Sequence, residues 1–148
     1  MEKNLSLFKN ISDVQVRNYE VDWQGIVHNA NYLHYYEVGR VNYLNSIGAK
    51  IDINSINSNV KILLVRNEIN YFKSAKLLED LIIYTRIPKI GNTSFVIEGA
   101  IYLKSTNELI SDNFAFHVWV DVETNKPTRV PEYFRDLVRK YEIELNEK

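Results

Sequence analysis

The residues best suited to chemistry lie between Tyr19 and Gly48, where an acid precedes a glycine turn and the start of a long helix. Asp22 stands three residues before Gly25, and Asn29 follows where the helix is expected to begin. The first turn of a helix has unpaired N–H groups, and the helix dipole adds positive potential there. A carboxylate nearby stays ionised, and a carbonyl oxygen brought to the same place is polarised. This arrangement is suited to attack on an acyl group.

Asp22 also has a simpler interpretation. An acid before a tight turn often does no more than accept hydrogen bonds from the local backbone. The Asp-x-x-Gly pattern alone is therefore a weak catalytic signal, because such turns are common. The longer pattern strengthens it, since an Asn-rich helix start follows and both Glu37 and Arg40 lie inside the helix.

The whole stretch resembles the 4-hydroxybenzoyl-CoA thioesterase-like branch of the hotdog-fold acyl-CoA thioesterases. The residues at matching positions of that motif are Asp22, Gly25, Ile26, Val27, Asn29, Tyr32 and Glu37. Weaker similarity extends over nearly the full length, including the turn at residues 89–91 with Ser94, and residues 126–131. Many relatives have Tyr then His where this chain has His28 then Asn29, so a catalytic histidine does not carry over directly.

The resemblance implies hydrolysis of an acyl-CoA to a free acid and coenzyme A, without a further cofactor. The Asp22 carboxylate would act as nucleophile or as general base for water. The backbone N–H near Asn29 would stabilise the oxyanion. His28 either lines the pocket or caps the helix start through a backbone hydrogen bond.

The remaining site residues are expected around the acyl group and the nucleotide. Gly25, Val27 and Tyr32 are expected to bind substrate. Glu37 either contacts substrate or pairs with Arg40, whose charge needs a carboxylate if it is buried. The alternative for Arg40 is that its charged group extends to solvent. Lys89, Thr93 and Ser94, around the Gly91 turn, are candidates for binding the phosphates of coenzyme A. The alternative is that this segment is only a solvated hairpin.

Two other functions fit the same resemblance. One is a hydratase acting on enoyl thioesters, although the local Asp–His motif of such enzymes is absent. The other is a sensor that binds acyl thioesters without turnover. The chain also lacks a G-x-S-x-G motif and a phosphate-binding glycine loop, and His28, His34 and His117 lack zinc spacing.

Composition bounds the remaining possibilities. The 148 residues, with 18 basic and 19 acidic side chains, predict a single domain over residues 1–148 and give no electrostatic support for a nucleic-acid partner. No cysteine is present, which excludes disulfides and thiol catalysis. No signal peptide or membrane-spanning run is evident, so we expect a cytoplasmic protein without membrane insertion.

Hydrophobic periodicity predicts a helix over residues 30–47, with an apolar face of Tyr32, Leu33, Tyr36, Gly39, Tyr43, Leu44 and Ile47. Strands are predicted over residues 10–19, 61–71, 80–90, 93–103 and 109–121, with short antiparallel connections. Within them, Leu63 and Val65 are assigned to an apolar face and Gly99 to a bulge. Residues 49–59 are expected to form a loop at a pocket mouth.

Pro131 is predicted to begin a C-terminal helix with Phe134, Leu137, Tyr141 and Leu145 on its inner edge. The predicted class is α+β. The resemblance specifies it further as a hotdog fold, with a five- to six-stranded antiparallel sheet around one long helix. Hotdog relatives pair edge to edge, with the active site between subunits. The resemblance therefore implies a homodimer or homotetramer.

Overall fold

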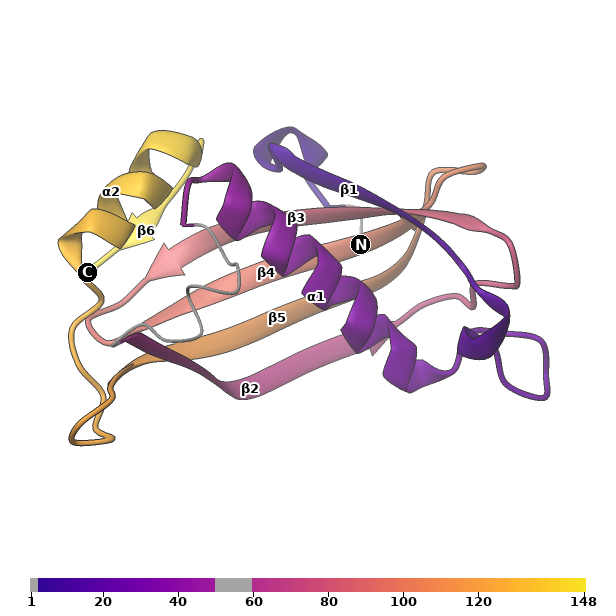
Figure 1. Ribbon diagram of the computed structural model, residues 1–148. Coiled ribbons are helices and arrows are strands. Elements are labelled where there is room, and N and C mark those ends of the chain that lie inside the picture. The colour runs from indigo at the N-terminus through magenta and orange to yellow at the C-terminus, as the bar shows by residue number, and fades with distance from the viewer. Residues whose placement is uncertain (1–2, 50–59) are drawn as a thin grey trace.

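One long helix lies across one face of an antiparallel sheet in the computed structural model, which describes residues 3–49 and 60–148 (Figure 1). The helix is α1, Asn29–Ser46. The main sheet has the order β1-β3-β4-β5-β2, with bounds Asn10–Gln15, Asp80–Ile90, Ser94–Leu103, Glu108–Asp121 and Val60–Tyr71 respectively. This arrangement is the α+β hotdog fold and confirms the predicted fold class.

Short elements complete the structure at the ends of the chain. Two 3-10 turns, η1 (Leu5–Leu7) and η2 (Asn18–Glu20), flank β1. Helix α2, Glu132–Tyr141, is followed by β6, Asn146–Glu147, which pairs in parallel with the end of β3. The predicted loop at residues 49–59 lies outside the described residues apart from Ala49. No helix in the described part of the chain is long and apolar enough to cross a membrane.

The predicted element boundaries hold within one or two residues except at two places. The first strand ends at Gln15, because the chain turns through η2 before reaching Asp22. The C-terminal helix ends at Tyr141, so Leu145 packs against the core from the tail that follows and not from the helix. Pro131 is the N-cap of α2 and not its first residue, as its extended backbone shows.

The buried face of α1 is formed mainly by tyrosines. Its buried residues are Tyr32, Tyr35, Tyr36, Gly39, Tyr43 and Leu44. Leu33 was expected in this set but is 38% exposed. Tyr35 was not expected but is fully buried, because its hydroxyl donates to the carboxylate of Glu20. A buried tyrosine usually needs such a partner, which apolar periodicity cannot reveal.

Gly99 allows the helix to approach the sheet closely. The predicted bulge there is wrong, since Gly99 pairs regularly with Thr85 and Asn113. A Cβ at this position would lie 2.6 Å from Cδ1 of Tyr36. The Tyr36 ring fills the space that a side chain at position 99 would occupy, which explains the glycine without a bulge at this position.

Strand β2 forms one edge of the sheet and contains one of the register shifts that the sequence pattern missed. Its register with β5 shifts between Leu64 and Arg66. The shift breaks the period-two alternation, so the prediction that Leu63 and Val65 share a buried face is wrong. Val65 is 60% exposed and Leu63 is 40% exposed.

Candidate active site

Asp22 begins a tight loop that connects η2 to α1. Its backbone N–H donates to the carbonyl of Ile26 over 2.9 Å, and the Gly25 N–H donates to the Asp22 carbonyl over 3.0 Å. Gly25 has a φ of 76°, which favours glycine. A bridge between Val21 and Val27 closes the loop. Glycine is therefore needed at position 25 for the turn itself.

The Asp22 carboxylate both supports this turn and faces a cavity. Its Oδ1 accepts the Gln24 N–H over 2.8 Å, while no hydrogen bond to Oδ2 is found among the described residues. The side chain lines a cavity of about 280 Å³, the Asp22 cavity, together with Ile26, Val27, Asn29, Tyr32, Tyr71, Phe72, Lys73 and Ser74. The turn thus uses one carboxylate oxygen, and the other has no assigned partner in the described residues.

The backbone donors at the start of α1 differ in whether they have an assigned acceptor. The N–H groups of Val27, His28 and Asn31 donate to the carbonyls of Ala75, Glu20 and His28, respectively. The Ala30 N–H donates to Nδ1 of His28 over 3.2 Å. Within residues 3–49 and 60–148, the Asn29 N–H has no assigned acceptor. Because Asn29 and Asp22 line the same cavity, an acceptor group bound there could reach both.

His28 serves as the N-cap of α1. It is exposed and does not line the Asp22 cavity. Since Nδ1 accepts the Ala30 N–H, a neutral ring could exchange a proton with substrate only through Nε2. The geometry supports the capping alternative more directly than a catalytic one.

Tyr32 forms a wall of the Asp22 cavity and is 3% exposed. Its hydroxyl accepts the Ala75 N–H over 3.1 Å, and its ring meets that of Tyr71 edge to face at 5.3 Å. Burial raises the pKa of Tyr32, so it remains a neutral hydroxyl. Among residues predicted to contact substrate, Val27 and Tyr32 lie with Asp22, whereas Gly25 shapes the turn outside the cavity.

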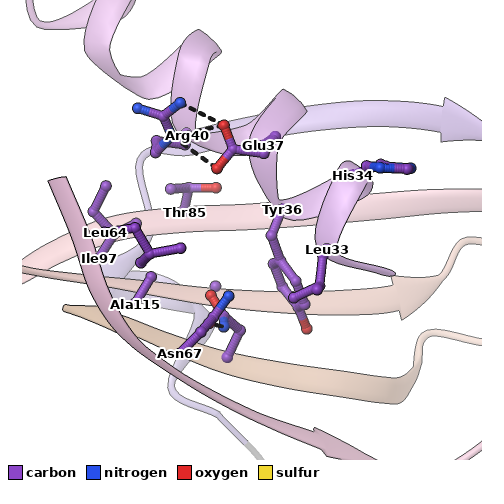
Figure 2. A pocket seen from close by; sticks show the side chains of 12 residues that line it. Leu33, His34, Tyr36, Glu37, Arg40, Leu64, Asn67, Thr85, Ile97 and Ala115 are labelled. Carbon is purple, nitrogen blue, oxygen red and sulfur yellow. Dashed lines mark hydrogen bonds and ion pairs between the residues drawn. The ribbon is translucent and has the colours of Figure 1, made fainter. Parts of the chain in front are cut away.

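Glu37 lies at a second cavity, of about 270 Å³, farther along α1 (Figure 2). Both Glu37 oxygens accept hydrogen bonds from Nε of Arg40 at 3.0 Å. The predicted pairing of Arg40 with Glu37 is confirmed. The remaining lining residues come from α1, β2 and the sheet beneath: Leu33, His34, Tyr36, Leu64, Asn67, Thr85, Ile97, Gly99, Asn113 and Ala115.

Both cavities lie along the line where α1 faces β2, which we call the α1–β2 seam. The Tyr71 hydroxyl at the end of β2 donates to the Asn29 carbonyl at the start of α1 over 3.2 Å. Moving back along β2, Asn67 and Leu64 line the second cavity opposite Leu33 and Arg40. The Asp22 cavity and the second cavity therefore occupy successive positions along the seam.

The predicted coenzyme A residues are not brought to Asp22 within one chain. Lys89, Thr93 and Ser94 lie at the β3–β4 turn, beside β6 (Figure 1). The Asp22 loop contacts the segment before β3, through Val27 and Ala75. The length of β3 separates these ends by roughly 30 Å. The sequence resemblance suggested both the Asp22 loop and the Gly91 turn as parts of the site, but it could not show that they lie at opposite ends of the sheet.

Tyr71, Phe72 and Lys73 line the Asp22 cavity but were not predicted from the sequence. They lie where β2 ends, and only the pairing of β2 with β5 brings that end to the start of α1. Their identities are ordinary for a strand end, so no local signal marks them. A correct prediction of the strand order would have placed the end of β2 beside the start of α1 and so suggested these residues.

Comparison with known proteins is consistent with this geometry. A putative acyl-CoA thioesterase, YneP from Bacillus subtilis, is 30% identical over 130 residues, covering 88% of this chain and 93% of its own. An acyl-acyl carrier protein thioesterase, ATL2 from Arabidopsis thaliana, is 30% identical over 83% of this chain. This chain spans 64% of the length of that plant relative.

Solved structures agree on the fold. A 1,4-dihydroxy-2-naphthoyl-CoA thioesterase from Synechocystis superposes with a TM-score of 0.81 at 18% identity, covering 88% of this chain and 96% of its own. A Staphylococcus aureus protein solved in complex with CoA superposes with a TM-score of 0.80 at 15% identity, covering 89% of this chain and 82% of its own.

The sequence also matches the family model of the thioesterase-like superfamily over residues 16–138. The chain therefore belongs to the thioesterase-like superfamily.

Proposed function

We propose that this protein, as one domain over residues 1–148, hydrolyses an acyl-CoA thioester to the free acid and coenzyme A. One observation carries the proposal. The Asp22 carboxylate and the Asn29 backbone, whose N–H has no assigned acceptor in the described residues, line one cavity at the start of α1. Membership of the thioesterase-like superfamily supports the same reaction.

Asp22 acts through the oxygen that the turn does not use. As a nucleophile, Oδ2 attacks the thioester carbonyl carbon, the C–S bond breaks, and the thiolate leaves and takes a proton. Water then hydrolyses the mixed anhydride and regenerates the carboxylate. As a general base, the carboxylate instead removes a proton from the water that attacks the same carbon. Both routes place the thioester carbonyl beside Asp22.

The negative charge that develops on the carbonyl oxygen is stabilised at the start of α1. The Asn29 N–H donates to it, and the dipole of this 18-residue helix adds positive potential. The carboxylate and the oxyanion donor thus approach the carbonyl from two different segments, the loop and the helix.

The acyl group extends along the α1–β2 seam toward the second cavity. Leu33, Leu64, Ile97 and Ala115 supply apolar contact there, and the Glu37–Arg40 pair lies at the same cavity. Asn29 and Glu37 are eight residues apart on one helix, so the two cavities lie about 12 Å apart along its axis. In this arrangement, Glu37 orders Arg40 and contacts only the distal part of the acyl chain.

A homodimer through β2 completes the site. The outer edge of β2 pairs with no strand in the described part of the chain, and Leu64 and Val65 are 49% and 60% exposed. Such an edge readily pairs with another chain. In a two-fold pair, the start of one β2 lies beside the end of the other.

This two-fold symmetry would allow Lys89, Thr93 and Ser94 to bind coenzyme A although they lie far from Asp22 within one chain. The start of β2 and the Gly91 turn lie at the same end of the sheet, because Lys61 pairs with Val120 and Ser94 pairs with Val118. A second copy therefore brings its Gly91 turn toward Asp22 of the first. Lys89, Thr93 and Ser94 would bind the nucleotide from that position.

The test is hydrolysis by an Asp22→Asn variant across a series of acyl-CoA chain lengths. Asparagine can still accept the Gln24 N–H, so the turn survives while the ionised oxygen is lost. We expect kcat to fall by ~10²–10⁴ with an unchanged melting temperature. Near-normal hydrolysis by this variant would contradict the assignment. Tight binding without turnover by the parent protein would instead favour a sensor, and hydration of crotonyl-CoA a hydratase.

A further inference from the structure

Glu20 is a buried acid two residues before Asp22, and it does not line the Asp22 cavity. It is 2% exposed, yet both carboxylate oxygens have partners. Oε2 accepts the Tyr35 hydroxyl over 2.8 Å and the Arg17 N–H over 2.8 Å. Oε1 accepts Nε of Arg17 over 2.9 Å. The carboxylate thus joins α1 to the segment that leads into the reactive loop.

The main chain of Glu20 makes a second set of contacts with the same helix. Its carbonyl accepts the His28 N–H over 2.9 Å and Nδ2 of Asn31 over 2.8 Å. Glu20 and His28 therefore flank the loop of residues 21–27, and the His28 N–H donates to the Glu20 carbonyl. The two ends of the loop meet at one buried residue, and Asp22 lies between them.

Part of this network has a purely local explanation. The bonds between Glu20 and Arg17 form a capping arrangement within η2. The bond to Tyr35 is not needed for that cap, because Tyr35 belongs to the second turn of α1 and is fully buried. A buried carboxylate is costly unless its hydrogen bonds are complete. Here the completing bond fixes the loop relative to the helix that carries the Asn29 N–H.

We propose that Glu20 is a positioning residue that sets Asp22 relative to the Asn29 N–H by fixing the reactive loop to α1 through Tyr35. The inference rests on the proposed function for its catalytic consequence. The structural part stands separately, since it concerns only how the loop is held.

A second hydrogen bond from a tyrosine of α1 to a glutamate, at the other end of the helix, provides a matched control. Glu142 accepts the Tyr43 hydroxyl over 2.5 Å and the Ile87 N–H over 2.8 Å. It joins a tyrosine of α1 to the C-cap of α2, remote from Asp22. Glu142→Gln and Tyr43→Phe therefore remove equivalent bonds without touching the loop.

The experiment compares Glu20→Gln and Tyr35→Phe with these two controls. The Glu20→Gln variant should lower kcat about tenfold to a hundredfold while KM changes little, because the site is misplaced and not removed. Tyr35→Phe should give a smaller loss, and the double variant should lose less than the product of the single losses. The controls should lower the melting temperature and leave kcat unchanged.

Amide hydrogen exchange gives a readout that does not depend on activity. In Glu20→Gln, the amides of Asp22 and His28 should exchange about tenfold faster, since their bonds close the loop. Unchanged exchange at these amides, or an equal fall of kcat in Glu142→Gln, overturns the inference. If Asp22→Asn retains activity while the exchange result holds, the proposed function fails and the positioning of the loop stands.

Discussion

At the scale of single residues, Asn29 differs from its neighbours in what its backbone does. The N–H groups of Val27, His28, Ala30 and Asn31 have acceptors, whereas none is assigned to that of Asn29 in the described residues. Its side chain plays no part in this difference. The residue type is visible in the sequence, whereas the difference between its N–H and those of its neighbours depends on hydrogen bonds that only the structure shows.

A proline at position 29 would remove this N–H selectively. Asn29 is the first helical residue, where proline is well tolerated, and His28 already has the extended backbone that precedes proline. We expect Asn29→Pro to lower kcat by ~10²–10³ while the melting temperature stays near that of the parent. Asn29→Ala, which keeps the N–H, should retain most activity. Equal kcat values for the two variants would contradict the oxyanion assignment.

His117 makes stability depend on pH. It is buried and stacked on Phe95 at 5.2 Å, and burial, with a contribution from the positive charge of Arg40, lowers the pKa of His117 to about 4. Between pH 6.5 and about 4, His117 therefore binds a proton in the unfolded chain but not in the folded chain. The contribution of neutral His117 to the free energy of unfolding is fully present above pH 6.5 and is lost as the pH falls toward about 4.

The expected effect of His117 is a loss of about 2 kcal/mol of unfolding free energy between pH 7 and pH 5. Urea unfolding at the two pH values measures it directly. A His117→Phe variant should lose this part of the pH dependence while keeping the stacked ring. An identical pH dependence in the variant and the parent would show that burial of His117 is not its cause.

At the scale of elements, the second cavity exists because α1 is close to the sheet on one side only. Gly39 and Gly99 bring the helix into contact with β3 and β4, whereas the seam toward β2 stays open. Periodicity predicted the helix and every main strand, since apolar spacing depends on local sequence. It could not predict the buried Tyr35 or the register shift in β2, which follow from hydrogen bonds and pairing between distant segments.

Filling the second cavity should change chain-length preference. Ala115 is buried at its floor, and Ala115→Phe would place a ring where a long acyl chain is expected. We expect kcat/KM for dodecanoyl-CoA to fall at least tenfold relative to butanoyl-CoA. Ile110→Phe, a buried substitution outside the cavity, controls for general strain. Equal losses for both substrates would place the acyl chain elsewhere.

At the scale of the whole molecule, the position of β2 at one edge of the sheet is the feature that the sequence predicted least well. The thioesterase resemblance implied an oligomer, and the proposed dimer uses this edge, where Leu63, Leu64 and Val65 are exposed. Sequence alone could not choose this edge, because the strand order depends on where each strand returns to the sheet. For the same reason, it could not place Lys89 at the end of the molecule opposite Asp22.

Charging this edge should separate the subunits. Val65→Lys places an ammonium group at the exposed register shift, where two copies would face the same charge. We expect sedimentation to show a dimer for the parent and a monomer for the variant, with similar far-ultraviolet circular dichroism. Lys61→Ala changes a side chain of the same strand without adding charge and should remain dimeric. A monomeric parent would contradict assembly through β2.

The hydrogen bond between Tyr71 and the Asn29 carbonyl links this edge to the reaction. Tyr71 ends the strand through which we propose that a second copy pairs, and Asn29 carries the N–H that we propose stabilises the oxyanion. If this proposal holds, pairing at β2 would also constrain the start of α1 through the Tyr71 hydrogen bond. Specific activity should then decline on dilution in parallel with the dimer fraction, so that turnover itself reports how much of the protein is paired.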